Sequence, residues 1–449
     1  MVRTISQEAF EDLVRENMEE LGMDPSEALE DAIQTLTLQG VDLSGLVTCL
    51  PGHAHANPLI QCLNTFTHLL TLPTPPQNDV AQAFQTLHRL CSHSPPNAAI
   101  ATKYDALRLA SSLCSKTPLS SSALLSALNA FSSLLHDVDS TAAFHRCGGP
   151  NLVVGFLAQN KGNVEVLSAG FRVVAAAATG DEIVKEAFME LKVDELILEI
   201  MLLHKGIQSL YDAIRALLTP DDNRVVASQV YGYARKFAKI GIAEALVDSL
   251  SAELSAPDLI SACTTLKVIA VNDEICKSIA EKGGIDAVLK CIDDSGEQGN
   301  KAVAKVCCSL LSKLAGSDMN KNAIVGKGGV DKLIKLSARF ADDPSVLQDI
   351  MSIISVLSLR SPENAARAIE AGAGDLAIQA MQKFPSAHQM QRNSCLMIRN
   401  LVVRNPENRT ILLNNGIEKY IRRAKQTHGN CKDAATDALR DLGVDSYNL

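Results

Sequence analysis

Two adjacent cysteines, Cys307 and Cys308, are the residues of this 449-residue chain whose type is best suited to covalent chemistry. A cysteine nucleophile needs a nearby base that can take its proton. Both cysteines fall on the apolar stripe of a predicted helix over residues 301–315, and that stretch contains no histidine. The pattern therefore indicates two packed core residues and no catalytic site.

Two histidines, His53 and His55, stand in a proline-flanked segment and could place two imidazoles near a metal ion. Metal sites usually need three or four ligands, and the neighbouring sequence offers only the distant His68. A flexible polar loop is the favoured interpretation, and a recognition motif for a modifying enzyme stays open. The glycine pairs at 283–284 and 328–329 lack the spacing of a phosphate-binding loop. The sequence predicts no enzyme, no metal site and no cofactor.

Charge is concentrated at the two ends of the chain. Residues 1–50 hold eleven acidic and two basic side chains, whereas residues 392–425 hold eight basic and two acidic ones. The basic stretch could bind an acidic partner or the acidic N-terminal segment, and a solvated surface is the alternative. Nucleic acid is disfavoured, because Tyr420 is the one aromatic residue in this stretch and the chain has a pI near 5.6.

The composition favours an all-helical core. Apolar residues make up 47% of the chain, aromatic residues only 4%, and tryptophan is absent. The twelve cysteines form no CxxC pair, which indicates reduced thiols. The N-terminus does not read as a signal peptide, and no run of 18 apolar residues occurs. These features predict a soluble cytoplasmic protein, with entry into the nucleus left open and no membrane partner.

A short motif that ends one apolar stretch and starts the next recurs seven times, with spacings of 43, 49, 43, 45, 44 and 43 residues. The aligned markers are Gly149, Lys192, Gly241, Gly284, Gly329, Ala373 and Gly416. This interval predicts an all-α fold, a right-handed armadillo-type α-solenoid of the ARM/HEAT superhelix kind.

Glycines at these points have a physical purpose. A helix that ends there needs a residue able to take a positive φ, and close helix crossing leaves no room for a Cβ atom. The structural junctions expected on this basis are Gly149, Gly241, Gly284, Gly329, Gly372 and Gly416. Between two junctions the apolar spacing predicts a short helix over 285–292, a break over 293–300 and a longer helix over 301–315.

The N-terminal third is less regular. Residues 6–21 predict an amphipathic helix with Leu21 on its apolar side, and Asp24 followed by Pro25 predicts the start of a second helix. The domain prediction is an acidic helical segment over 1–50, a proline-containing linker over 51–80 and a solenoid over 81–449. The solenoid begins with degenerate repeats and ends in a capping helix, and whether the acidic segment caps it or is free stays open.

Several short motifs carry a resemblance. Residues 398–402 (IRNLV) resemble the end of an armadillo repeat. Residues 10–17 (FEDLVREN), 39–44 (QGVDLS) and 438–443 (ALRDLG) together resemble the armadillo repeat-containing protein 6 family. The resemblance implies an intracellular helical repeat protein that binds other proteins.

A groove for nuclear localisation signals, as in importin-α-like proteins, is disfavoured. Such grooves use a ladder of Trp and Asn residues on the last helix of each repeat. This chain has no tryptophan, and the positions aligned with the asparagines are Ser133, Ala176, Ala216, Val268, Lys313, Val356 and Asn400. Asn400 could hold a ligand backbone, although a bond to the adjacent loop is the favoured interpretation.

The sequence therefore predicts a non-catalytic scaffold, expected to be a monomer, that binds protein partners in a groove formed by the last helix of each repeat. A transport adaptor is the alternative, and an enzyme is less favoured. A sparse basic track would favour a ligand that carries an acidic segment. The predicted binding residues are Lys267, Lys313, Leu396, Arg399, Asn400 and Arg404.

Overall fold

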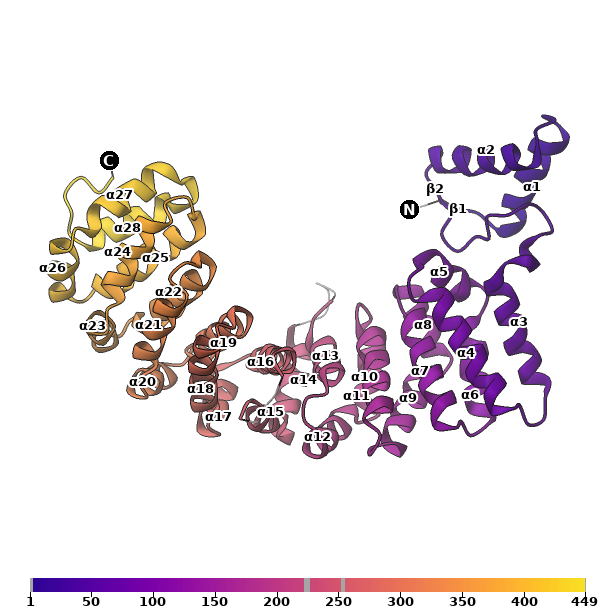
Figure 1. The fold of residues 1–449 in the computed structure, drawn as a ribbon, viewed down its shortest axis with the longest axis horizontal. Helices are drawn as coiled ribbons and strands as arrows, with labels where there is room; N and C mark the ends of the chain where they lie inside the picture. The colour runs from indigo at the N-terminus through magenta and orange to yellow at the C-terminus, as the bar shows by residue number, and fades with distance from the viewer. Residues whose placement is uncertain (1–2, 222–226, 252–254, 449) are drawn as a thin grey trace. The chain divides into compact units, whose positions relative to one another are not determined.

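The computed structural model describes residues 3–221, 227–251 and 255–448, drawn in Figure 1. The described residues form 28 α-helices, two 3-10 helices and one two-stranded sheet. The predicted fold class, an all-α solenoid, is confirmed. The contacts divide the chain into two compact units, Met1–Ala227 and Ser228–Leu449, and each is described by itself.

The first unit opens with a small module, residues 3–50, which we call the N-terminal module. Its elements are β1 Arg3–Thr4, α1 Gln7–Glu19, α2 Pro25–Leu38 and β2 Val41–Asp42, with β1 and β2 paired in parallel. As predicted, Asp24 caps α2 and Pro25 is its first residue. Leu21 departs from the prediction: it follows the end of α1 and is 63% exposed.

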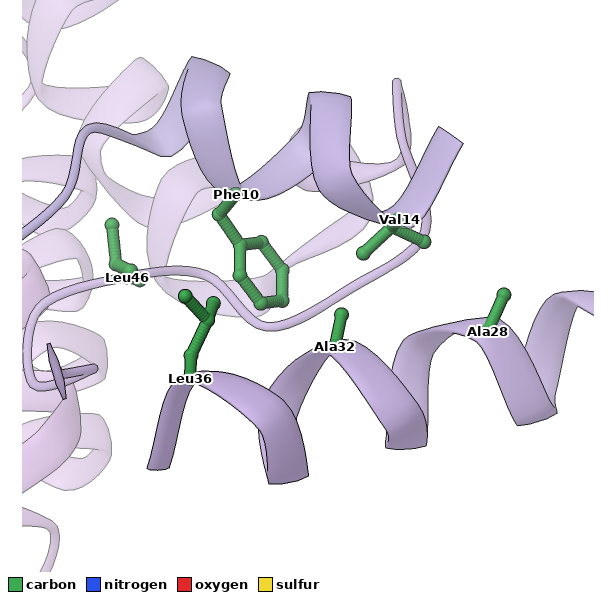
Figure 2. Packing of buried hydrophobic residues seen from close by; sticks show 6 residues of the cluster. All are labelled: Phe10, Val14, Ala28, Ala32, Leu36 and Leu46. Atoms are coloured by element: carbon green, nitrogen blue, oxygen red, sulfur yellow. The ribbon is translucent and has the colours of Figure 1, made fainter. Parts of the chain in front are cut away.

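The N-terminal module has a hydrophobic core of its own. Figure 2 shows Phe10 and Val14 of α1 facing Ala32 and Leu36 of α2, with Leu46 closing the cluster. The alanines of α2 allow the two helices to approach each other closely. Every residue of this cluster lies before residue 51, so the module's core needs no side chain from the repeats.

Residues 51–80, predicted to be a linker, contain the 3-10 helix η1, Ala54–Ala56, and the helix α3, Pro58–Thr71. Pro58 starts α3 because the first turn of a helix needs no N–H donor, and Asn57 caps it. Phe66 of α3 packs edge-to-face on Phe84, with ring centroids 5.0 Å apart. This part of the chain is therefore packed into the first repeat.

Helices follow in groups of a first, a second and a third helix. The remaining helices of the first unit are α4 Gln77–Cys91, α5 Pro95–Lys103, α6 Ala106–Lys116, α7 Ser121–Leu134, α8 Val138–Arg146, α9 Gly149–Gln159, α10 Val164–Ala178, α11 Glu182–Glu190, α12 Val193–Leu203 and α13 Gln208–Leu218. Here the third helices are α4, α7, α10 and α13, and each packs on the next.

The second unit repeats the same order. Its helices are α14 Ala227–Ile240, α15 Ile242–Leu250, α16 Ala256–Ile269, α17 Asp273–Glu281, α18 Gly284–Glu297, α19 Lys301–Leu314, α20 Asp318–Gly326, α21 Gly329–Arg339, α22 Pro344–Ser358, α23 Pro362–Glu370, α24 Ala373–Lys383, α25 His388–Val402, α26 Pro406–Asn414, α27 Ile417–Thr427, η2 Gly429–Cys431 and α28 Lys432–Asp441. The third helices α16, α19, α22, α25 and α28 pack on one another in that order.

Each turn from a first to a second helix passes through one left-handed residue. Gly241, Gly372 and Gly416 take positive φ at these junctions, as predicted. At Gly284, Gly329 and Gly149 the expected positive φ is absent, whereas the expected lack of room for a Cβ atom is confirmed. Their left-handed residues are the preceding glycines 283, 328 and 148, and the second glycine of each pair begins the next helix.

The second glycine of each pair is required by packing. A Cβ atom on Gly284 would lie 2.7 Å from the carbonyl oxygen of Ile279, and a Cβ atom on Gly329 would lie 2.7 Å from that of Ile324. A Cβ atom on Gly149 would meet the ring of Phe144 at 2.3 Å. The two glycines of a pair thus satisfy two separate demands, one conformational and one steric.

Two junctions do without glycine. Lys192 takes φ +59°, which confirms the junction that the repeat spacing placed there. Asp105 takes the same φ before α6 and marks a junction 43 residues ahead of Gly148 that the sequence analysis missed. Because neither residue is a glycine, only the repeat spacing could have revealed them.

The helix predicted over 285–292 is longer than expected, since α18 continues to Glu297. Gly296 does not break it. The side chain of Leu336 on α21 lies 3.1 Å from where a Cβ atom of Gly296 would stand, so this glycine allows α18 and α21 to approach each other. The helix predicted over 301–315 is confirmed as α19.

Buried lysines tie the first helix of a repeat to the end of its third helix. Lys185 of α11 is fully buried, and its Nζ donates to the carbonyl of Thr219 at 2.6 Å and pairs with Asp221 at 2.6 Å. In the second unit, Lys321 of α20 donates to the carbonyl of Leu359 at 3.2 Å. Both lysines lie on the first helix of a repeat and bind a carbonyl just after the third helix of the same repeat, where a helix end leaves carbonyls unsatisfied.

Candidate functional site

The polar side chains on the third helices of the second unit form the candidate binding surface. We call it the third-helix face and define it by residues of α16, α19, α22 and α25. They are Lys267, Ser309, Ser312, Lys313, Asp349, Ser352, Ser355, Leu396, Arg399 and Asn400.

A depression of about 310 Å³ lies at the α16 end of this face. Lys267 and Lys313, both predicted binding residues, line it together with hydroxyls from α19 and α22. The Nζ of Lys267 donates to Ser309 Oγ at 2.7 Å. Within the described part of the chain, no carboxylate forms an ion pair with Lys267 or Lys313. Both lysine side chains are exposed.

One carboxylate, that of Asp349, also lines the depression. Its Oδ2 lies 3.7 Å from the Nζ of Lys305. Partial burial raises the pKa of Asp349, and the charges of Lys305 and Lys267 oppose this shift. The ammonium groups of Lys267, Lys305 and Lys313 outnumber this carboxylate, so the depression keeps an excess of positive charge.

Arg399 is placed differently from the prediction of an open basic track. Its guanidinium pairs with Asp437 at 3.1 Å and with Asp441 at 3.2 Å, both on α28. It thereby fastens the last helix to α25 and carries little free charge. Arg404 lies beyond the end of α25, in an exposed turn.

Asn400 binds the neighbouring third helix and not the adjacent loop. Its Nδ2 donates to both the carbonyl and the hydroxyl oxygen of Ser355 on α22, each at 2.9 Å. A ligand backbone would have to displace these bonds. Leu396, one turn before Asn400, is half-buried.

The structure thus brings Lys267 and Lys313 together and groups Leu396, Arg399 and Asn400 on α25. The sequence analysis missed the serines of the depression. Ser309 lies 42 residues after Lys267, and Ser352 lies 43 residues after Ser309. An alignment of the repeats could therefore have found both serines.

The basic stretch 392–425 holds the chain end in place and is not a continuous open patch. Arg409 donates to the carbonyls of Val402 and Val403. Arg422 pairs with Glu418 and also binds carbonyls near the C-terminus. These internal bonds explain why the local charge excess overstates the charge available to a partner.

The residues considered for chemistry are core or loop residues. Cys307 and Cys308 are buried as predicted, and burial raises the pKa of Cys308 to about 12, so this thiol stays protonated. His53 and His55 are exposed. Across the described ranges, no group of three or more His, Cys, Asp or Glu side chains is arranged to hold a metal ion. Within the same ranges, no helix has the length and apolar character of a membrane span.

Family models and known proteins that are similar to this chain point to the same family. The ARMC6 family model matches residues 77–447, and the model of the armadillo repeat-containing protein 6 N-terminal domain matches residues 2–59. Armadillo repeat-containing protein 6 of Homo sapiens is 28% identical over 391 residues, which cover 81% of this chain and 75% of that protein. The Drosophila melanogaster homolog is 26% identical over 389 residues, covering 83% and 81%.

Among solved structures, the crystal structure of an engineered protein from a structural genomics consortium matches with a TM-score of 0.73. The match covers 98% of this chain and 99% of the other, at 18% sequence identity. It supports the repeat fold alone.

Proposed function

The chain belongs to the armadillo repeat-containing protein 6 family, and from that premise we propose that it acts as a protein-binding scaffold. The armadillo fold is typical of such scaffolds. The partner carries an acidic segment and docks on the third-helix face, while the chain itself is a monomer in the cytoplasm or the nucleus.

The observation that carries this proposal is the pair of exposed ammonium groups of Lys267 and Lys313, which line one depression and exceed its single carboxylate. Such charges attract an acidic segment before contact and set the salt dependence of binding. Half-buried apolar side chains such as Leu396 contribute contact area. Without aromatic anchors, the affinity should be modest.

The transport-adaptor alternative finds less support. A cargo groove of the known kind needs free asparagines along the third helices, and Asn400 is already bonded to Ser355. An enzyme would need a clustered acid, base or nucleophile, and the candidate nucleophiles Cys307 and Cys308 are packed in the core.

The experiment compares proteins captured from cell extract by the full chain and by two double variants. Lys267→Glu with Lys313→Glu reverses the charge of the depression. The matched control, Lys290→Glu with Arg423→Glu, reverses two exposed charges on the second helices α18 and α27.

We expect the first variant to recover its principal partner at least about tenfold less well, with an unchanged melting temperature, because exposed charges contribute little to folding. The control should capture that partner normally. Equal capture by all three proteins at low salt would reject the third-helix face as the docking surface.

A further inference from the structure

A second cleft, of about 680 Å³, lies within the first unit between the N-terminal module and α5. Apolar side chains form its floor: Leu46, Val47 and Ile100 are only 5%, 3% and 6% exposed. Ala56 of η1 and Pro96 of α5 stand at the rim. The volume suits one or two apolar side chains of a bound segment.

The walls of this cleft are held in place by specific bonds. The backbone N–H of Val47 donates to Gln7 Oε1 at 2.9 Å, and its carbonyl accepts from Gln7 Nε2 at 3.0 Å. On the other side, Lys103 of α5 donates to the carbonyl of Ser44 at 2.9 Å. A Cβ atom on Gly45 would lie only 2.7 Å from Cδ of Lys103, so the glycine leaves room for the lysine side chain. The cleft is therefore formed before any ligand binds.

The charged groups beside the cleft are mostly acidic. Among the described residues, Asp12 is the one carboxylate of the N-terminal module that forms an ion pair, with Arg15. Burial and the Glu11 carboxylate raise the pKa of Cys49, a residue lining the cleft. Asp42 accepts from the backbone N–H of the lining residue Ser44 at 2.8 Å, and the ammonium of Lys103 binds the carbonyl of the same residue. The carboxylates of Glu11 and Asp42 outnumber this one cation, so the field at the cleft favours cations.

We propose that this cleft is a peptide-binding site for a partner segment in which apolar side chains are flanked by lysine or arginine. The apolar floor takes the anchor, and the carboxylates of Glu11 and Asp42 attract the flanking cations. This site is independent of the third-helix face, which favours acidic segments. The chain would then join two partners of opposite charge.

The test measures binding of fluorescent hexapeptides to the full chain. Each peptide has two central leucines, flanked on both sides by lysines, by glutamines or by glutamates. We expect the lysine peptide to bind most tightly and to weaken as salt is raised.

Two variants locate the site. Ala56→Trp fills the cleft from its exposed rim, whereas His55→Trp places the same ring on the same 3-10 helix outside the lining. Filling should weaken the lysine peptide by about tenfold or more, and the control should match the wild type within about twofold. Thr48→Trp, on another part of the rim, provides a second filling variant if the first one melts early.

Three results would overturn the proposal. One is the failure of the lysine peptide to bind below about 1 mM. Another is equal binding by filled and wild-type protein, which would indicate nonspecific attraction to the acidic surface. The third is equal binding of the glutamine peptide, which would remove the charge requirement.

Discussion

In each Gly-Gly junction the first glycine takes a positive φ and the second leaves room for close packing. Gly328 takes φ +73° and has room for a Cβ atom, which would lie 3.9 Å from Asp331 Oδ2, whereas Gly329 begins the next helix and has no room for one. The sequence alone shows both glycines but cannot separate these demands, because the second depends on how closely the backbone of Ile324 approaches.

The steric demand predicts a specific loss of stability. Gly329→Ala places a methyl group against the Ile324 carbonyl, which must shift, so the free energy of unfolding should fall by about 1–3 kcal/mol. Denaturant unfolding of the full chain measures this change.

The matched control lies three residues earlier. Gly326 ends α20 without a positive φ, and a Cβ atom there meets nothing within 4 Å. Gly326→Ala should therefore leave stability unchanged or raise it by up to about 1 kcal/mol. Equal stability losses in the two variants would contradict the steric explanation.

At the scale of elements, α3 is the start of the repeats, and the N-terminal module is an addition to them. After Pro58, the exposed residues of α3 are polar, as a terminal helix requires, and include Gln61, Asn64, Thr65, His68 and Thr71. The inner face of α3 packs on α4 through Phe66 and Phe84.

This arrangement predicts where the chain can be shortened. A chain starting at Asn57 keeps the cap of α3 and should retain its helical circular dichroism per residue and a cooperative melt. A chain starting at Gln77, which the predicted linker would have allowed, exposes the face of α4 that carries Phe84. It should melt earlier or aggregate. A molten product from the Asn57 chain would show that the N-terminal module is needed to cap the repeats.

At the scale of the whole molecule, periodicity predicted the fold because each repeat packs mainly on its neighbours. The junction at Lys192 followed from the repeat interval alone. The junction at Asp105 was not predicted, because the repeats before residue 144 are less regular in sequence. The binding surface was only partly predictable. The sequence shows that residue 399 is an arginine, but the pairing of Arg399 with Asp437 and Asp441 depends on where α28 packs.

The same limit applies to the predicted linker. Proline at position 58 reads as a loop signal, yet a proline at the first turn is compatible with a helix, and the capping bond of Asn57 decides between the two. The apolar cleft beside α5 was invisible in the sequence because its floor combines residues from segments about 50 positions apart.

The most direct test of the third-helix face is a lysine footprint of the full chain with and without its principal captured partner. Acetylation of each exposed lysine is followed by mass spectrometry. We predict that the partner protects Lys267 and Lys313 by several-fold, since it must desolvate their ammonium groups, and leaves Lys290 on α18 as reactive as before. Protection of Lys290 with continued reaction of Lys267 and Lys313 would contradict the assignment of the binding surface.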